Sequence, residues 1–217
     1  IVNGLTSYTQ EVTLHLRNMS WPALLSLPLL LANSLSTELV GLRVFLVQAF
    51  VGILDLGIIW GLWQVLKSQT QKLSLTRTHH HIALAFFVLP YFTIADQIRP
   101  SLEHASAIAF WVSLGWLVRG AYLRAGLTSM AIAAFRYPSG LLTAGIFLWV
   151  LFFSIKNKKI SPLKRFTLGL ILGAVIFGIA DAVYYGRPWE SLWMYTQYNV
   201  LTGLSSQLFG EQSPLVY

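Results

Sequence analysis

Long apolar segments separated by short basic ones dominate this chain. A helix needs about 20 predominantly apolar residues to cross a bilayer. The strongest candidates for such helices are residues 42–66, 82–94, 105–118, 141–155 and 168–183. The second and third are short and need flanking residues to cross. The pattern predicts an all-α polytopic membrane protein with short or broken helices.

The basic residues define an orientation for these helices. Two basic segments, residues 67–81 and 156–165, lie beside apolar spans, and the positive-inside rule places such segments in the cytosol. One crossing from the second segment then puts Asp181 on the opposite side. One crossing from the first segment puts Arg99 on that same side, and the next returns Arg124 to the cytosol.

The segment 126–155 must then hold two further crossings. At 1.5 Å per residue it spans only about 45 Å of helix, too little for two complete spans. Pro138 removes a backbone donor and disfavours helix at the residue before it, and Gly140 follows closely. We therefore expect a broken helix pair with its break at residues 136–140.

The N-terminal part is also irregular. Residues 21–32 are apolar but short and contain Pro22 and Pro28, which predicts a re-entrant or tilted segment. The chain starts with Ile, and no charged n-region precedes an apolar stretch. We therefore interpret residues 1–217 as a single transmembrane domain and an internal fragment of a longer chain.

Composition narrows the functional classes. Hydrophobic residues make up 55% of the chain and charged residues 11%, against about 25% charged in soluble domains. The net charge of +7 comes from short runs beside apolar spans, so the positive-inside rule explains it without nucleic acid as a partner. With no Cys, disulfides and thiolate ligands are excluded.

Residues 181–217 follow an apolar span yet are rich in aromatic, amide, hydroxyl and glycine groups, which predicts a non-cytosolic, ligand-facing loop. The residues stand in the order Asp181, Tyr184, Tyr185, Gly186, Trp189, Tyr198, Asn199, Ser205, Ser206, Phe209, Gly210, Pro214 and Tyr217. This order resembles the loop of the dolichyl-phosphate-mannose-dependent α-mannosyltransferases, glycosyltransferase family 22. An interfacial aromatic belt would explain the aromatic residues, but not the amide, hydroxyl and glycine positions.

The resemblance implies a GT-C-like multi-span helical bundle. It also implies mannosyl transfer with inversion from a polyprenyl (dolichyl) phosphate mannose to a lipid-linked glycan, either the N-glycan precursor or the GPI core. No metal and no cofactor is expected, and the catalytic Asp would lie upstream of Ile1. The location implied is the endoplasmic reticulum membrane in a eukaryote and the inner membrane in a bacterium.

Cations on the loop side suit the departing lipid phosphate, because guanidinium groups pair with phosphate in a bidentate manner. Arg136 is the strongest candidate, since a charge within an apolar stretch is expensive to bury. Arg99 and Glu103 are four residues apart and could instead simply pair with each other. The full set of candidates for binding donor phosphate or substrate is Arg17, Arg99, Glu103, Arg136, Asp181, Tyr185, Asn199, Ser205, Ser206 and Gly210.

Two further ionisable residues receive no role in the chemistry. Asp55 lies in the middle of an apolar span, where a hydrogen bond to a neighbouring helix would explain it. His104 has no carboxylate at a readable spacing. A polytopic transporter, with Asp55 and Arg136 on its substrate pathway, and a non-catalytic membrane scaffold remain as alternative functions.

Overall fold

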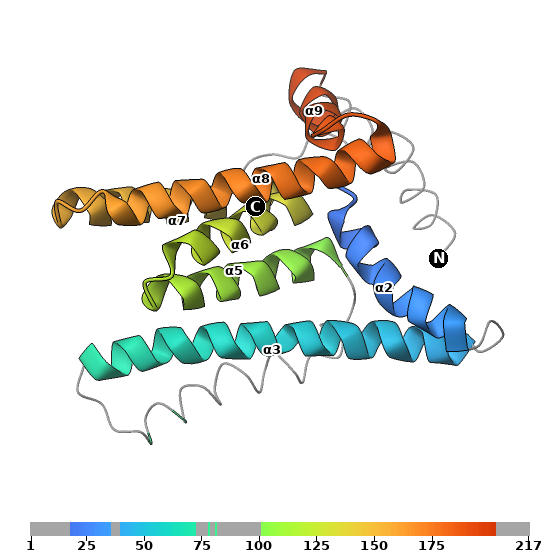
Figure 1. Cartoon of the computed structure of the whole chain (residues 1–217), viewed down its shortest axis with the longest axis horizontal. Coiled ribbons are helices and arrows are strands. Elements are labelled where there is room, and N and C mark those ends of the chain that lie inside the picture. The colour runs from blue at the N-terminus through green and yellow to red at the C-terminus, as the bar shows by residue number, and fades with distance from the viewer. Residues whose placement is uncertain (1–17, 36–39, 73–77, 79–80, 82–100, 203–217) are drawn as a thin grey trace, which may run out of the picture. The chain divides into compact units, whose positions relative to one another are not determined.

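The protein is helical throughout the part that the computed structural model describes, residues 18–35, 40–72, 78, 81 and 101–202, apart from short turns (Figure 1). The elements are α2 (Ser20–Leu35), α3 (Val40–Lys72), α5 (Leu102–Val118), α6 (Tyr122–Phe135), η2 (Tyr137–Ser139), α7 (Gly140–Lys156), α8 (Ser161–Tyr185), α9 (Glu190–Thr196) and η3 (Gln197–Leu201). These ranges contain no strand. The all-α prediction is confirmed.

Three helices in the described ranges are long and apolar enough to cross a membrane. They are Val40–Gln69, Tyr137–Lys156 and Ser161–Tyr185. α2 and α5 are apolar but shorter, as their sequences predict. The expected span at residues 82–94 lies outside the described residues. The chain is therefore a multi-span membrane protein.

The chain divides into two compact units. The larger unit is Trp21–Val175, and the smaller combines Ile1–Ser20 with Ile176–Tyr217. α8 contributes to both. The larger unit holds α2 to α7 and most of α8, so it contains the helix packing from which its candidate site is built.

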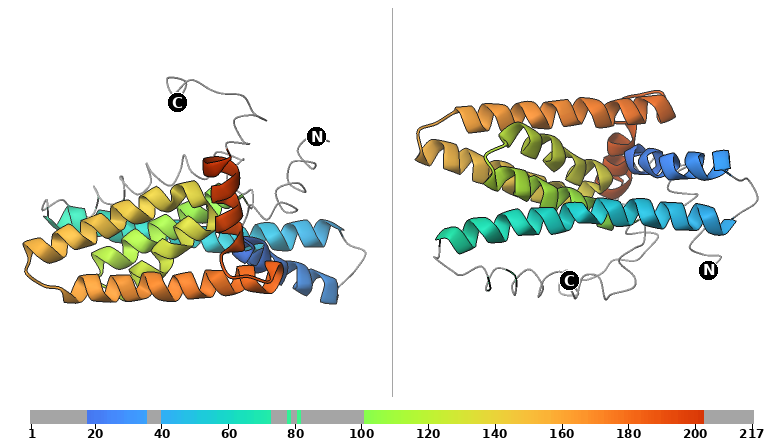
Figure 2. Two further views of the ribbon diagram at one scale, coloured as in Figure 1. Left: turned by 90° about the horizontal axis from the view of Figure 1, so that it is seen from above. Right: turned by 60° about the horizontal axis from the view of Figure 1, so that its bottom comes forward.

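Close backbone approach joins α3 to α5 in the larger unit. A Cβ added at Gly61 would lie 2.1 Å from the carbonyl oxygen of Trp111, and one at Gly115 would lie 2.5 Å from the Trp60 ring. Small residues let membrane helices approach in this way. Because contacts advance along both helices in the same direction, α3 and α5 run parallel (Figures 1 and 2).

α6 also packs against α8 through glycines that let the two backbones approach closely. A Cβ at Gly126 would lie 2.1 Å from the Phe166 carbonyl oxygen, and one at Gly169 would lie 2.1 Å from the Leu123 carbonyl oxygen. The left-handed Gly120 (φ +72°) turns the chain from α5 into α6, which therefore runs antiparallel to α5.

Hydroxyl groups add polar links between the helices. The Ser113 and Ser129 hydroxyl oxygens are 2.5 Å apart across α5 and α6, and the Thr143 hydroxyl donates to the Ser129 carbonyl at 2.7 Å. Each of the three residues is buried. The contacts satisfy polar groups that would be costly to leave unpaired in an apolar interior.

The helix directions gather basic residues at one end of the larger unit. The ends concerned are the C-terminal ends of α3, α5 and α7 and the N-terminal ends of α6 and α8. They carry Lys67, Arg119, Arg124, Lys156, Lys164 and Arg165. The Arg124 guanidinium also lies 4.8 Å from the centre of the Trp116 ring. This segregation is what the positive-inside rule requires of a cytosolic end.

The predicted helix break is confirmed. α6 ends at Phe135, Arg136 is extended (φ −146°, ψ 106°), and η2 leads into α7. The broken pair was expected within residues 126–155, but its first helix begins earlier, at Tyr122, directly after the turn. With 14 residues, α6 is only about 21 Å long.

The segment expected to be a loop, residues 181–217, is helical as far as Leu201. α8 continues through Asp181 to Tyr185, and Gly186 (φ +82°) then ends it. α9 and the π-helical turn η3 follow. Glycine adopts a left-handed conformation at no steric cost, so it stops a helix without preventing another from starting. Residues 203–217 lie outside the described residues.

Gly61→Ala in the full-length protein should lower the free energy of unfolding by about 1–3 kcal/mol, because the new methyl group meets the α5 backbone. The measurement is thermal denaturation in detergent. Gly52→Ala on the same helix is the matched control, since a Cβ there meets nothing within 4 Å. Equal stability of the two variants would contradict the proposed α3–α5 approach.

Candidate functional site

An ion pair lies at the break between α6 and η2. The Arg136 Nε is 3.2 Å from a Glu103 carboxylate oxygen, and the two side chains are 42% and 57% exposed. Glu103 belongs to the first turn of α5. The structure thus brings two predicted site residues together. Arg99, the other partner considered for Glu103, lies outside the described residues.

The break fixes the backbone on both sides of Arg136. Its N–H donates to the Ile132 carbonyl at 3.3 Å, and its carbonyl accepts from the Ser139 N–H at 2.9 Å. A guanidinium carries five N–H donors in a rigid fork. Among the described residues only Nε is paired, so the two terminal amino groups can bind an anion.

An apolar cavity of about 190 Å³ borders this break. It lies between α2, α3, α5 and α6 in the larger unit, and the Trp21 and Phe135 rings meet there with their centres 5.5 Å apart. Its lining residues include Trp21, Leu24, Leu54, Ala105, Ile108 and Phe135. Phe135 directly precedes Arg136 in the chain, so the cavity reaches the residue next to the cation. This arrangement suits an amphiphilic ligand with an anionic group.

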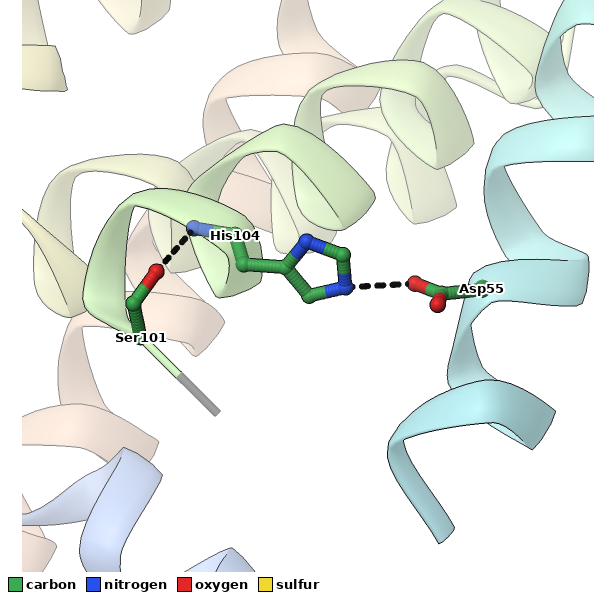
Figure 3. Close-up of polar contacts among 3 residues, drawn as sticks. All are labelled: Asp55, Ser101 and His104. Carbon is green, nitrogen blue, oxygen red and sulfur yellow. Dashed lines mark hydrogen bonds and ion pairs between the residues drawn. The ribbon is translucent and has the colours of Figure 1, made fainter. Parts of the chain in front are cut away.

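A second polar pair lies in the same region of the larger unit (Figure 3). The His104 Nε2 is 2.6 Å from an Asp55 oxygen, and the residues are 6% and 1% exposed. The His104 N–H donates to the Ser101 hydroxyl at 3.1 Å, which caps α5. The expected bond from Asp55 to a neighbouring helix is confirmed. The expectation that His104 lacks a carboxylate partner was wrong, because its partner stands 49 residues away on α3.

The smaller unit has its own polar cluster, built around Asp181. This side chain is fully buried. One of its oxygens accepts from the Asn18 amide at 2.9 Å and the Met19 N–H at 3.4 Å. The other accepts from the Ser191 N–H at 3.1 Å and from the Ser191 hydroxyl. A buried carboxylate with four protein donors has its hydrogen-bonding capacity well satisfied. Asp181 therefore acts as a clamp that holds residues 18–19 and Ser191 against the end of α8.

The other candidates in the smaller unit are placed less tightly. Tyr185 is the last residue of α8 and is half-buried. Asn199 lies in η3, where its amide donates to the Tyr195 carbonyl at 3.0 Å. Arg17, Ser205, Ser206 and Gly210 lie outside the described residues.

No group of three or more His, Cys, Asp or Glu side chains in the described ranges could hold a metal ion.

These features define a polytopic membrane protein in which a cation and an apolar cavity lie at one helix break. Residues 3–217 match the model of the Alg9-like mannosyltransferase family, and the chain belongs to this family. No curated protein and no solved structure matches it. Membership confirms the family resemblance and makes the chain a glycosyltransferase, which acts with a sugar donor and a glycan acceptor.

Asp181→Asn in the full-length protein should reduce the free energy of unfolding by about 1–3 kcal/mol, because the new amide group turns a donor toward donors. Thermal denaturation of the purified protein measures this loss. Glu190→Gln removes the same charge close by, without a described hydrogen bond, and should have little effect. Equal losses would show that charge and not the clamp matters.

Proposed function

We propose that the protein transfers mannose from a polyprenyl (dolichyl) phosphate mannose to a lipid-linked glycan, the N-glycan precursor or the GPI core. Family membership supports mannosyl transfer. The observation that carries the donor class is the Arg136 guanidinium, held at a helix break beside an apolar cavity. A nucleotide-linked sugar has no long apolar chain that could occupy this cavity.

The reaction explains why the cation is needed. The bond between mannose C1 and the phosphate oxygen breaks, and the acceptor hydroxyl oxygen bonds to C1 with inversion. Negative charge develops on the departing polyprenyl phosphate, where a fixed cation stabilises the transition state more than the ground state. The acceptor proton passes to a carboxylate base, a role that we assign to none of the described residues.

Arg136 supplies the charge that a metal would otherwise supply, so the proposed reaction needs no metal and no cofactor. Its Nε is held by Glu103, which leaves the terminal amino groups to contact two phosphate oxygens. Arg17 and Arg99 are proposed as further ligands of the donor phosphate or of the substrate.

The Asp181 clamp has an indirect part in the proposal. Asn18, one of its donors, directly follows Arg17 in the chain, so the clamp fixes the backbone beside a proposed phosphate ligand. We propose that five residues of the segment 181–217 contact the substrate from the smaller unit. They are Tyr185, Asn199, Ser205, Ser206 and Gly210. In a eukaryote this activity would belong in the endoplasmic reticulum membrane.

Arg136→Ala in the full-length protein should lower mannosyl transfer from polyprenyl phosphate mannose roughly 100-fold, as losing one transition-state donor does. Arg136→Lys should retain part of the activity, because the charge stays but the fork is lost. The assay counts labelled mannose in lipid-linked product at equal membrane content of enzyme.

Arg124→Ala is the control for this substitution. Arg124 lies on the same helix but at the basic end, where it stacks on Trp116. Full transfer by Arg136→Ala, or an equal loss in Arg124→Ala, would contradict the proposed phosphate contact.

Asn199→Ala should lower transfer roughly tenfold while leaving membrane insertion intact, since a lost hydrogen bond to a charged or polar substrate group has about this effect. Gln197→Ala, at an exposed position of the same turn, should leave transfer unchanged. Unaltered kinetics in Asn199→Ala would remove this residue from the proposed substrate contacts.

A further inference from the structure

We propose that the buried Asp55–His104 pair is a positioning device for Arg136, the proposed phosphate ligand. This inference rests on the proposed function. Neither residue contacts the ligand in this account. Both act through the first turn of α5, where Glu103 and His104 are consecutive residues that point in different directions.

Consecutive residues on an α-helix point about 100° apart. His104 therefore reaches α3, where its Nε2 meets Asp55 at 2.6 Å, while Glu103 reaches the break after α6, where it meets Arg136 at 3.2 Å. If α5 rotates about its axis, both contacts change together. Holding His104 on Asp55 thus sets the direction in which Glu103 presents its carboxylate.

The same part of α5 also holds the backbone of Arg136. The Ser106 hydroxyl donates to the Ile132 carbonyl at 3.1 Å, and this carbonyl accepts the Arg136 N–H at 3.3 Å. Three neighbouring positions of α5 therefore reach α3, the Arg136 side chain and the carbonyl that anchors the Arg136 backbone. The cation is fixed by α5 in two independent ways.

Simple attachment of α3 to α5 does not need this pair. The glycine contacts around Gly61 and Gly115 already bring the two backbones together. A buried carboxylate is costly without a partner, so Asp55 tolerates only those rotations of α5 that keep His104 in reach. The pair adds a polar restraint on the rotation of α5 to the restraint that the glycine contacts already impose.

The test is a double-mutant cycle in the full-length enzyme, with His104→Ala, Arg136→Ala and the combination. His104→Ala should lower kcat/KM for polyprenyl phosphate mannose about tenfold, through a lower kcat and a higher donor KM together, and leave the KM for the glycan acceptor unchanged. A loss of folded enzyme would lower kcat alone. In the Arg136→Ala background, His104→Ala should cause no further change, because coupled residues are non-additive.

Two further variants sharpen the result. His104→Gln can place an amide nitrogen near the Asp55 oxygen and should restore most of the donor affinity. Ser113→Ala removes an equally buried bond between the C-terminal half of α5 and the middle of α6, and should leave the donor KM unchanged. If His104→Ala does not reach the membrane folded, Asp55→Asn replaces it in the cycle with Arg136→Ala.

The outcomes separate the two proposals. Additive effects of the His104 and Arg136 substitutions, or a donor KM shift as large in Ser113→Ala, would overturn the positioning role and leave the proposed function standing. Wild-type transfer by Arg136→Ala would remove the phosphate contact itself, and the positioning role with it. Non-additivity with rescue by Gln supports the inference.

Discussion

The close approach of helix backbones at glycines is the constraint on which the larger unit depends. In a bilayer, apolar side chains gain little by leaving lipid for protein, so helices associate through tight packing and polar contacts. Gly61 and Gly115 bring α3 to α5, and Gly126 and Gly169 bring α6 to α8. Only at such short separations can Asp55 and His104 meet.

This packing makes a helix break tolerable. A non-helical residue at membrane depth must have its backbone groups satisfied within the protein. The Arg136 N–H and carbonyl both have partners, and its side chain pairs with Glu103. Basic residues gather at the opposite end of the unit, so Arg136 lies apart from that basic cluster, where the proposed ligand can reach it.

The sequence predicted much of this architecture for simple reasons. Uninterrupted apolar runs reveal α3, α7 and α8, and a proline after a charged residue reveals the break at Arg136. The start of α6 was missed because helix geometry had been counted from Arg124, whereas the turn at Gly120 lets the helix begin earlier. The helical character of residues 190–201 was hidden by their aromatic and polar composition.

Only part of the candidate site could be predicted from the sequence. Arg136 stands out because its charge interrupts an apolar stretch, but the partners of Glu103 and His104 lie 33 and 49 residues away on other helices. The spacing of residues along one helix cannot predict such pairs, because helix packing brings the partners together. The Asn18–Asp181 contact, across 163 positions, joins two distant segments, and the sequence of neither one indicates the other.

The most direct test of the central claim compares sugar donors. The purified full-length protein, reconstituted in lipid vesicles with a lipid-linked glycan acceptor, would be given labelled mannose either on polyprenyl phosphate or on a nucleotide. The account predicts labelled glycan from the lipid donor and none from the nucleotide donor. Transfer from the nucleotide donor, or from neither donor with any acceptor, would contradict it.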